Sequence, residues 1–73
     1  PASPHRQLLK EGVKHTREGR FDRALDAWIE VLKKEPEYRE TARKACIAVF
    51  KFLGEDSATT QEYRPKFSGA LYS

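Results

Sequence analysis

The stretch EGRFDRALDAWIEVLKKEP, from Glu18 to Pro36, decides the fold of this chain. Its apolar residues recur at spacings of three and four, which predicts an amphipathic helix over residues 21–34. An acidic residue in the first turn and two lysines in the last suit the helix dipole, and Pro36 then ends the helix. The inward-facing positions are expected to be Phe21, Ala24, Leu25, Trp28, Val31 and Leu32.

A second helix is predicted just before this one, over residues 4–18, with Leu8, Leu9 and Val13 on one narrow face. Gly12 lies inside it at a cost of about 1 kcal/mol relative to alanine, so we expect another helix to approach closely there. Gly19 can end this helix in a left-handed conformation that other residues resist. The connection is therefore short, and the two helices should form an antiparallel hairpin.

The rest of the chain predicts a second helical pair. One helix should begin between residues 37 and 41 and end at Gly54; its apolar arc is wider than one face, so we expect neighbours on two sides. In the last segment, Pro65 predicts either a kink near Arg64 or a second helical start at the proline itself. The residues expected to face inward from this segment are Tyr63, Phe67, Ala70, Leu71 and Tyr72.

Composition agrees with one small all-α domain over residues 1–73. The apolar fraction is 38% and the charged fraction 34%, with few glycines and prolines, which favours a short helical bundle over a sheet protein. The net charge of +3 is spread among mixed signs, so it does not favour nucleic acid. One cysteine allows no internal disulfide, and no apolar run is long enough for a bilayer, as is typical of a cytoplasmic protein.

Four residues of the first hairpin carry a repeat signature. Gly12, Ala24, Trp28 and Pro36 follow in the order, and over about the length, of a tetratricopeptide repeat starting near residue 5, and Gly19 and Phe21 supply the usual turn. The region 5–36 thus resembles one repeat, and 39–73 resembles a degenerate repeat or cap. The resemblance implies two antiparallel helical hairpins of the α-α superhelix type.

The tail resembles a more particular family, the thioredoxin-like co-chaperones or chaperedoxins. The resemblance implies that the chain is the C-terminal helical domain of a longer protein with an N-terminal thioredoxin-like domain, which also fits the lack of methionine. It further implies a domain that helps to bind unfolded clients and to dock on the chaperonin or other chaperones. The matching elements are Ala42-Arg43-Lys44, Leu53-Gly54-Glu55-Asp56, Tyr63-Arg64 and Ala70-Leu71-Tyr72.

The tail motifs supply the candidate partner-binding residues Tyr63, Arg64, Leu71 and Tyr72. Arg43 and Arg64 are expected to pair with acidic residues of the turn at 55–56, or else to contact the thioredoxin-like domain. Leu71 and Tyr72 either cap the core or dock on a partner as an apolar anchor.

A basic stripe along the first helix suggests the alternative function. Its four cations could bind an acidic peptide or a phosphate backbone, as a free-standing helical module would. The opposing reading pairs the stripe with an acidic stripe on the second helix, which needs no ligand. The basic residues are Arg6, Lys10, Lys14 and Arg17, and the acidic ones are Asp22, Asp26 and Glu30.

No residue pattern suggests an enzyme. Cys46 lies among apolar residues and is expected to pack in the core, and His15 has no nearby nucleophile or metal partner in the sequence. Paired carboxylates, zinc-ligand clusters and phosphate-binding loops are missing from the sequence. We therefore expect no catalytic residue, metal or cofactor.

Overall fold

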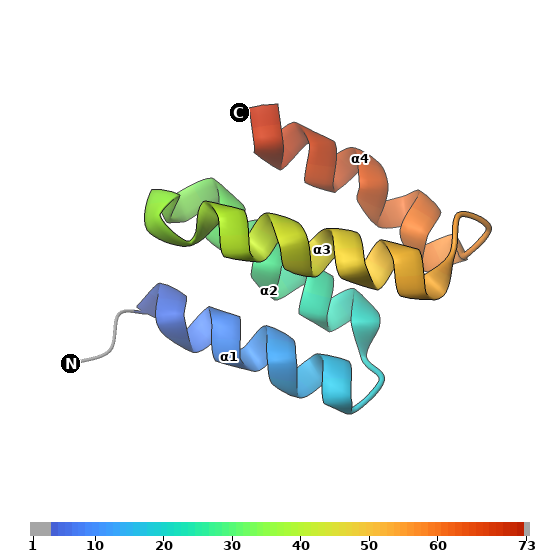
Figure 1. Cartoon of the computed structure of the whole chain (residues 1–73), viewed down its shortest axis with the longest axis horizontal. Helices are drawn as coiled ribbons and strands as arrows, with labels where there is room; N and C mark the ends of the chain where they lie inside the picture. Colours follow the sequence, from blue (N-terminus) through green and yellow to red (C-terminus); the bar gives the residue numbers. More distant parts are fainter. Residues whose placement is uncertain (1–3, 73) are drawn as a thin grey trace.

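The computed structural model describes residues 4–72, and side chains from residue 7 onward, as an array of antiparallel helices (Figure 1). The helices are α1 (Pro4–Arg17), α2 (Phe21–Lys34), α3 (Arg39–Leu53) and α4 (Ala58–Tyr72), with a 3-10 turn, η1 (Pro36–Tyr38), between α2 and α3. Within the described residues there is no strand, so the predicted all-α fold of two helical hairpins is confirmed.

The first hairpin turns at Gly19, as predicted. Gly19 has a φ of 76°, in the left-handed region. Its N–H donates to the carbonyl of Thr16 at 3.1 Å, and the N–H of Arg20 donates to the carbonyl of His15 at 2.8 Å. These two hydrogen bonds form a Schellman motif, which satisfies the last carbonyls of α1 and sends the chain back along it.

Helix α2 is the centre of the core. It packs against α1, α3 and α4, and its apolar stripe is almost fully buried. Trp28 is only 5% exposed and lies against Gly12 of α1, where the two helices cross. The buried apolar residues of the core are Ala24, Leu25, Trp28, Ile29, Val31, Leu32, Ala42, Cys46, Val49, Phe50, Tyr63, Phe67 and Ala70.

Helix α4 closes the core from the other side. It packs along α2 as well as α3, and the ring of Phe67 meets that of Phe50 edge-on with centroids 5.5 Å apart. Helix α3 buries only part of its wide apolar arc, because Phe52 at its last turn is 75% exposed. The prediction that α3 has neighbours on two sides is confirmed by its packing on α2 and on α4. Phe52 contacts the first hairpin through the ring of Phe21 and otherwise faces water.

Pro65 does not break the last helix. Helix α4 is continuous from Ala58 to Tyr72 with Pro65 inside it, so the predicted second start is wrong. The proline removes the hydrogen bond to the carbonyl of Gln61. Both residues are exposed, so the missing bond falls on the solvent side of the helix. Tyr72 was expected to face inward and is instead 89% exposed, because α4 ends beyond the edge of the core.

Arg39, the first residue of α3, ties two helix ends together. Its Nη1 donates to the carbonyl of Leu32 in the last turn of α2 at 3.2 Å, and its Nη2 donates to the carbonyl of Leu71 in the last turn of α4. Such terminal carbonyls have no partner within their own helices. The guanidinium also places a positive charge beside the negative ends of two helix dipoles.

Candidate functional site

An apolar groove opens between α1, the start of α2 and α3. Its volume is about 380 Å³. It is open to solvent, and the edge of the buried Trp28 ring forms part of its lining. The residues that line it are Thr16, Phe21, Trp28, Ala45, Ala48, Val49 and Phe52.

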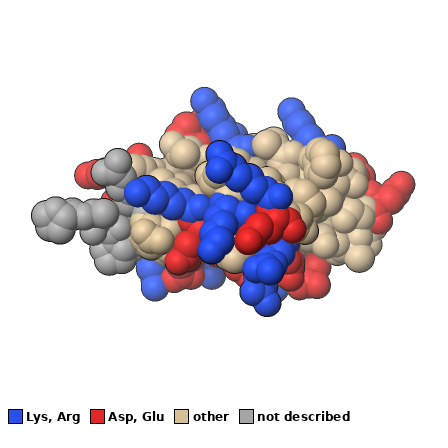
Figure 2. Space-filling view, turned by 90° about the horizontal axis from the view of Figure 1, so that it is seen from below, with Lys and Arg blue, Asp and Glu red and all other residues tan. Residues whose placement is uncertain are grey.

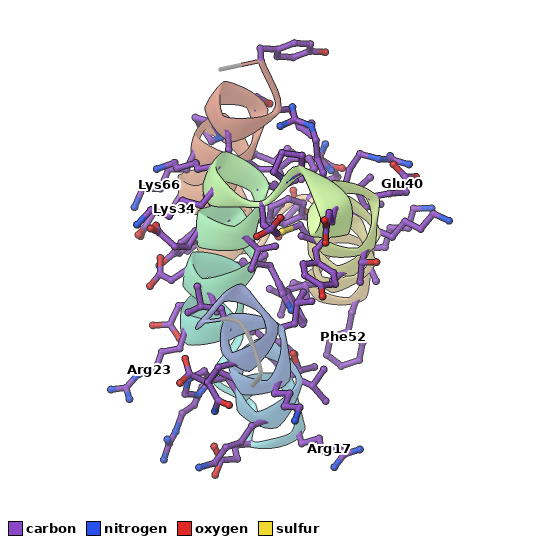
Figure 3. All side chains as sticks on the ribbon, turned by 90° about the vertical axis from the view of Figure 1, so that its left-hand side faces the viewer. Arg17, Arg23, Lys34, Glu40, Phe52 and Lys66 are labelled. Atoms are coloured by element: carbon purple, nitrogen blue, oxygen red, sulfur yellow. The ribbon has the colours of Figure 1, made fainter. Side chains whose placement is uncertain are left out.

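Phe52 is the most exposed of the large apolar residues that line the groove. It projects from the last turn of α3 into the space beside α1 (Figure 3). Its ring packs on that of Phe21 with centroids 5.4 Å apart and a tilt of 40°, and 75% of the residue remains in contact with water. Burying a phenylalanine side chain fully is worth about 2 to 3 kcal/mol. A partner that covers Phe52 would therefore gain a substantial part of that free energy.

Small side chains create the space of the groove. Ala45 and Ala48 line the α3 wall, where larger residues would fill the volume. On the α1 wall, the hydroxyl of Thr16 donates to the carbonyl of Gly12 at 2.8 Å. That polar group is thereby satisfied within its own helix, so the groove offers mainly carbon atoms to a ligand.

The predicted basic stripe lies on the outer face of α1. Lys10, Lys14 and Arg17 are exposed around Val13, which is itself 47% exposed, and together with Glu18 they line a shallow depression. The side chain of Arg6 lies outside the described residues. Figure 2, which views the molecule from the α1 side, shows blue side chains crossing this face with red ones between them.

Within the described residues, Lys10, Lys14 and Arg17 of the basic stripe form no ion pair with the acidic stripe of α2. Tyr63 of α4 donates a hydrogen bond from its hydroxyl to the Asp26 carboxylate. The partner of Asp26 therefore lies on α4, not on α1. Among the described side chains, no ion pair joins Lys10, Lys14 or Arg17 to an acidic residue. The predicted pairing across the hairpin is thus not seen for these three cations, and for Arg6, whose side chain lies outside the described residues, it stays a prediction.

The four candidate partner-binding residues of the tail do not form one surface. Tyr63 is buried, and burial, followed by the hydrogen bond to Asp26, raises the pKa of its hydroxyl to about 12. Arg64 pairs with Glu55 at 2.8 Å, and its guanidinium lies 5.3 Å from the centroid of the Phe50 ring. Leu71 packs partly on the core, whereas Tyr72 projects into solvent.

Arg43 does not reach the acidic turn at 55–56. It forms an ion pair with Glu40, three residues before it on the same helix, which replaces the predicted contact. This hydrogen-bonded pair lowers the pKa of the Glu40 carboxyl and raises the pKa of Arg43. Both side chains lie at the surface, so the pair contributes little to folding.

Neither Cys46 nor His15 has surroundings typical of a nucleophile, a redox thiol or a metal ligand. Cys46 is fully buried, and burial raises the pKa of its thiol to about 12, so the reactive thiolate is scarce at neutral pH. His15 is half-buried, and its Nδ1 has no hydrogen-bond partner among the described residues. Over the described part of the chain, no three His, Cys, Asp or Glu side chains gather as metal ligands, and no helix could cross a membrane.

The repeat-signature residues take structural positions. Gly12 and Trp28 meet at the α1–α2 crossing, Ala24 is buried, and Pro36 begins η1 after the end of α2. Gly54 ends α3 with a φ of 89°.

Two features were not predicted from the sequence, the groove and the role of Arg39. The width of the apolar arc on α3 was the available signal for the groove, since apolar residues in excess of one buried face must lie somewhere on the surface.

Comparison with known proteins agrees with this geometry. The family model described as "Tetratricopeptide repeat" matches residues 3–72. Searches among curated proteins and among solved structures gave no significant match.

Proposed function

Because this chain belongs to the tetratricopeptide repeat family, we propose that it is a protein-interaction module and that its partner binds in the apolar groove of Phe52. The observation that carries this proposal is the exposure of Phe52 beside a groove that continues down to Trp28. Large apolar residues that stay in water next to a concave apolar surface mark interaction sites.

We further propose that the module is the C-terminal helical domain of a thioredoxin-like co-chaperone in the cytoplasm. Support comes from the tail motifs, which include Ala42-Arg43-Lys44, Leu53-Gly54-Glu55-Asp56 and Tyr63-Arg64. In this role the groove would hold apolar segments of unfolded clients, and the domain would also contact the chaperonin or another chaperone. Nothing in this role calls on the chain for catalysis.

A binding assay tests both levels of the proposal. The full 73-residue chain is immobilised and exposed to reduced, carboxymethylated α-lactalbumin as an unfolded client, and separately to purified chaperonin. We expect both to bind, and we expect Phe52→Ala to weaken client binding about tenfold. Tyr72→Ala is the matched control, because Tyr72 is also an exposed aromatic residue but is not part of the groove.

The outcomes separate the two levels. If the client binds through Phe52 but chaperonin does not bind, the co-chaperone role is wrong and the interaction module stands. If Phe52→Ala binds the client as tightly as the parent chain, the groove is not the binding site.

A further inference from the structure

We propose that the groove selects an acidic segment of a partner protein, with one aromatic side chain inserted beside Phe52 and carboxylates on either side of it. This inference rests on the proposed function, because it names the class of segment that the same groove takes. It follows from the charges along the two walls of the groove, Lys44 and Lys51 on α3 and Arg17 on α1.

Helix α3 carries two exposed lysines, Lys44 and Lys51, beside the residues that line the groove. Lys44 is four residues before Ala48 and Lys51 is three residues after it, so both lie next to this groove-lining alanine on the helix surface. Neither lysine has an ion-pair partner among the described residues. Hydrogen bonding from Arg43 lowers the pKa of the Glu40 carboxyl, and the charge of the nearby Lys44 lowers it further. Lys51 has no such neighbour among the described residues. Both lysines can therefore contact a ligand in the groove, and Lys51 is the less engaged of the two.

The α1 wall is basic as well. Arg17 follows the groove residue Thr16 in the last turn of α1, and it lines the shallow depression on the outer face of that helix together with Val13. Helices α1 and α3 end at the same side of the molecule (Figure 1), and the side chains of Arg17 and Phe52 both project to the right of the ribbon in Figure 3. Phe52 therefore projects from the same face of the molecule as Arg17, one turn or less from Lys51 on its own helix.

Three acidic residues near this region form ion pairs with other side chains. Glu18 pairs with Arg20 at 3.6 Å. Glu40 of α3 pairs with Arg43, and Glu55 in the turn after α3 pairs with Arg64. Asp56 of the same turn forms no ion pair among the described residues. Asp22, which follows the groove residue Phe21, is exposed and likewise forms no ion pair within the described part of the chain. Near the groove, the cations Arg17, Lys44 and Lys51 thus outnumber Asp22 and Asp56, the acidic residues without an ion-pair partner in the described structure, so a net positive charge remains on this side.

This charge distribution decides between possible occupants. A second copy of the chain would bring Phe52 together with its own Lys51 and Arg17, so like charges would oppose a symmetric dimer at this groove. An acidic partner gains from the same charges. The groove volume of about 380 Å³ suits one large side chain and the adjoining backbone rather than a folded domain.

A peptide titration tests the inference. The probe is a fluorescein-labelled peptide with one tryptophan between two pairs of glutamates, and the reference is the same peptide with glutamines; binding is followed by fluorescence anisotropy. We expect the acidic peptide to bind about tenfold more tightly at about 50 mM NaCl, and the difference to shrink at about 300 mM. Lys44→Glu and Lys51→Glu should each weaken the acidic peptide about fivefold and leave the reference peptide unchanged.

Lys33→Glu is the matched control for charge reversal, because Lys33 is an exposed lysine on the α2–α4 side, away from the groove. It should leave acidic-peptide binding nearly unchanged.

Several outcomes would contradict the inference. Equal affinity of the two peptides, or equal loss of acidic-peptide affinity from Lys33→Glu and Lys51→Glu, would overturn the charge selection while leaving the groove as a protein-binding site. Failure of both peptides to bind, with client binding unaffected by Phe52→Ala, would overturn the proposed function itself. A further outcome is that single-stranded DNA displaces the acidic peptide, and does so equally well in the Phe52→Ala variant. That result would overturn the inference and indicate a nucleic-acid-binding surface instead.

Discussion

Gly12 of α1 is packed so closely on Trp28 of α2 that a Cβ atom at Gly12 would lie 2.2 Å from Nε1 and 2.4 Å from Cε2 of the indole ring. Such distances are far below van der Waals contact. A glycine is therefore needed here to let the two helices approach closely. It is not needed for an unusual backbone conformation, because Gly12 is helical. The indole in turn fills the volume beside that crossing and is 5% exposed.

The first prediction is that Gly12→Ala destabilises the domain. Alanine gains about 1 kcal/mol of helix propensity, but the methyl group must displace a large ring in a packed core, which typically costs about 1 to 3 kcal/mol, so the net effect is a loss. Gly69→Ala is the matched control in α4, where a Cβ meets no atom within 4 Å. That variant should be more stable by up to about 1 kcal/mol. Urea denaturation followed by circular dichroism measures both, and a stabilised Gly12→Ala variant would contradict the close contact.

The second prediction concerns the other side of this contact. Trp28→Ala should lower the free energy of unfolding by about 3 to 5 kcal/mol, because it empties the centre of the core. In a domain of 73 residues such a loss approaches the whole stability, so the variant should be largely unfolded at 25 °C. Far-UV circular dichroism and thermal melting provide the measurement. A variant that melts like the parent chain would contradict the placement of Trp28.

A coupling experiment makes the contact itself testable. Gly12→Ala combined with Trp28→Phe should be less destabilising than the sum of the two single changes, because the smaller ring makes room for the methyl group. Additive effects would mean that the two residues do not touch.

The third prediction concerns Arg39, which donates to the terminal carbonyls at Leu32 and Leu71. Arg39→Met keeps the length and apolar stem of the side chain but removes both hydrogen bonds, so we expect a loss of about 1 to 3 kcal/mol in urea denaturation. Arg43→Met is the control, since Arg43 is also an arginine of α3 but only pairs with Glu40 at the surface. It should have little effect. Equal losses from the two variants would mean that the link between α2 and α4 is not a stabilising feature.

How much of this was predictable differs between the fold and the site. Helix α2 could be located to the residue, because its apolar spacing and its boundaries at Gly19 and Pro36 all agree. The predicted second helical start at Pro65 was wrong. A proline inside a helix is costly when the carbonyl that loses its hydrogen bond is buried, and the sequence does not show that the carbonyl of Gln61 faces water.

The site depends on relations between helices, which sequence periodicity does not contain. The periodicity of α3 shows that Phe52 belongs to an apolar arc, but not that Thr16 and Phe21 leave that part of the arc uncovered. Arg39 was missed for the same reason, since Leu32 and Leu71 lie far from each other along the chain and only the packing of α4 on α2 brings their carbonyls to one side chain.

The last prediction concerns alkaline pH and Cys46. Burial raises the pKa of this thiol from its ordinary value of 9.0 to about 12, so the unfolded chain releases the proton at a lower pH than the folded chain. Above pH 9 the unfolded state therefore binds fewer protons, and the stability contributed by the neutral thiol is lost as pH rises toward 12, at about 1.4 kcal/mol per pH unit. In Cys46→Ala the free energy of unfolding lacks this dependence on pH. At pH 7.5 the variant should be less stable than the parent chain, because the substitution leaves a small cavity. The difference in unfolding free energy between the two proteins should narrow by roughly 1 kcal/mol at pH 10, measured by urea denaturation under reducing conditions. Tyr63 titrates in both proteins, so its contribution cancels in the comparison. A gap that stays constant from pH 7.5 to 10 would show that the Cys46 thiol ionises as readily in the folded chain as in the unfolded one.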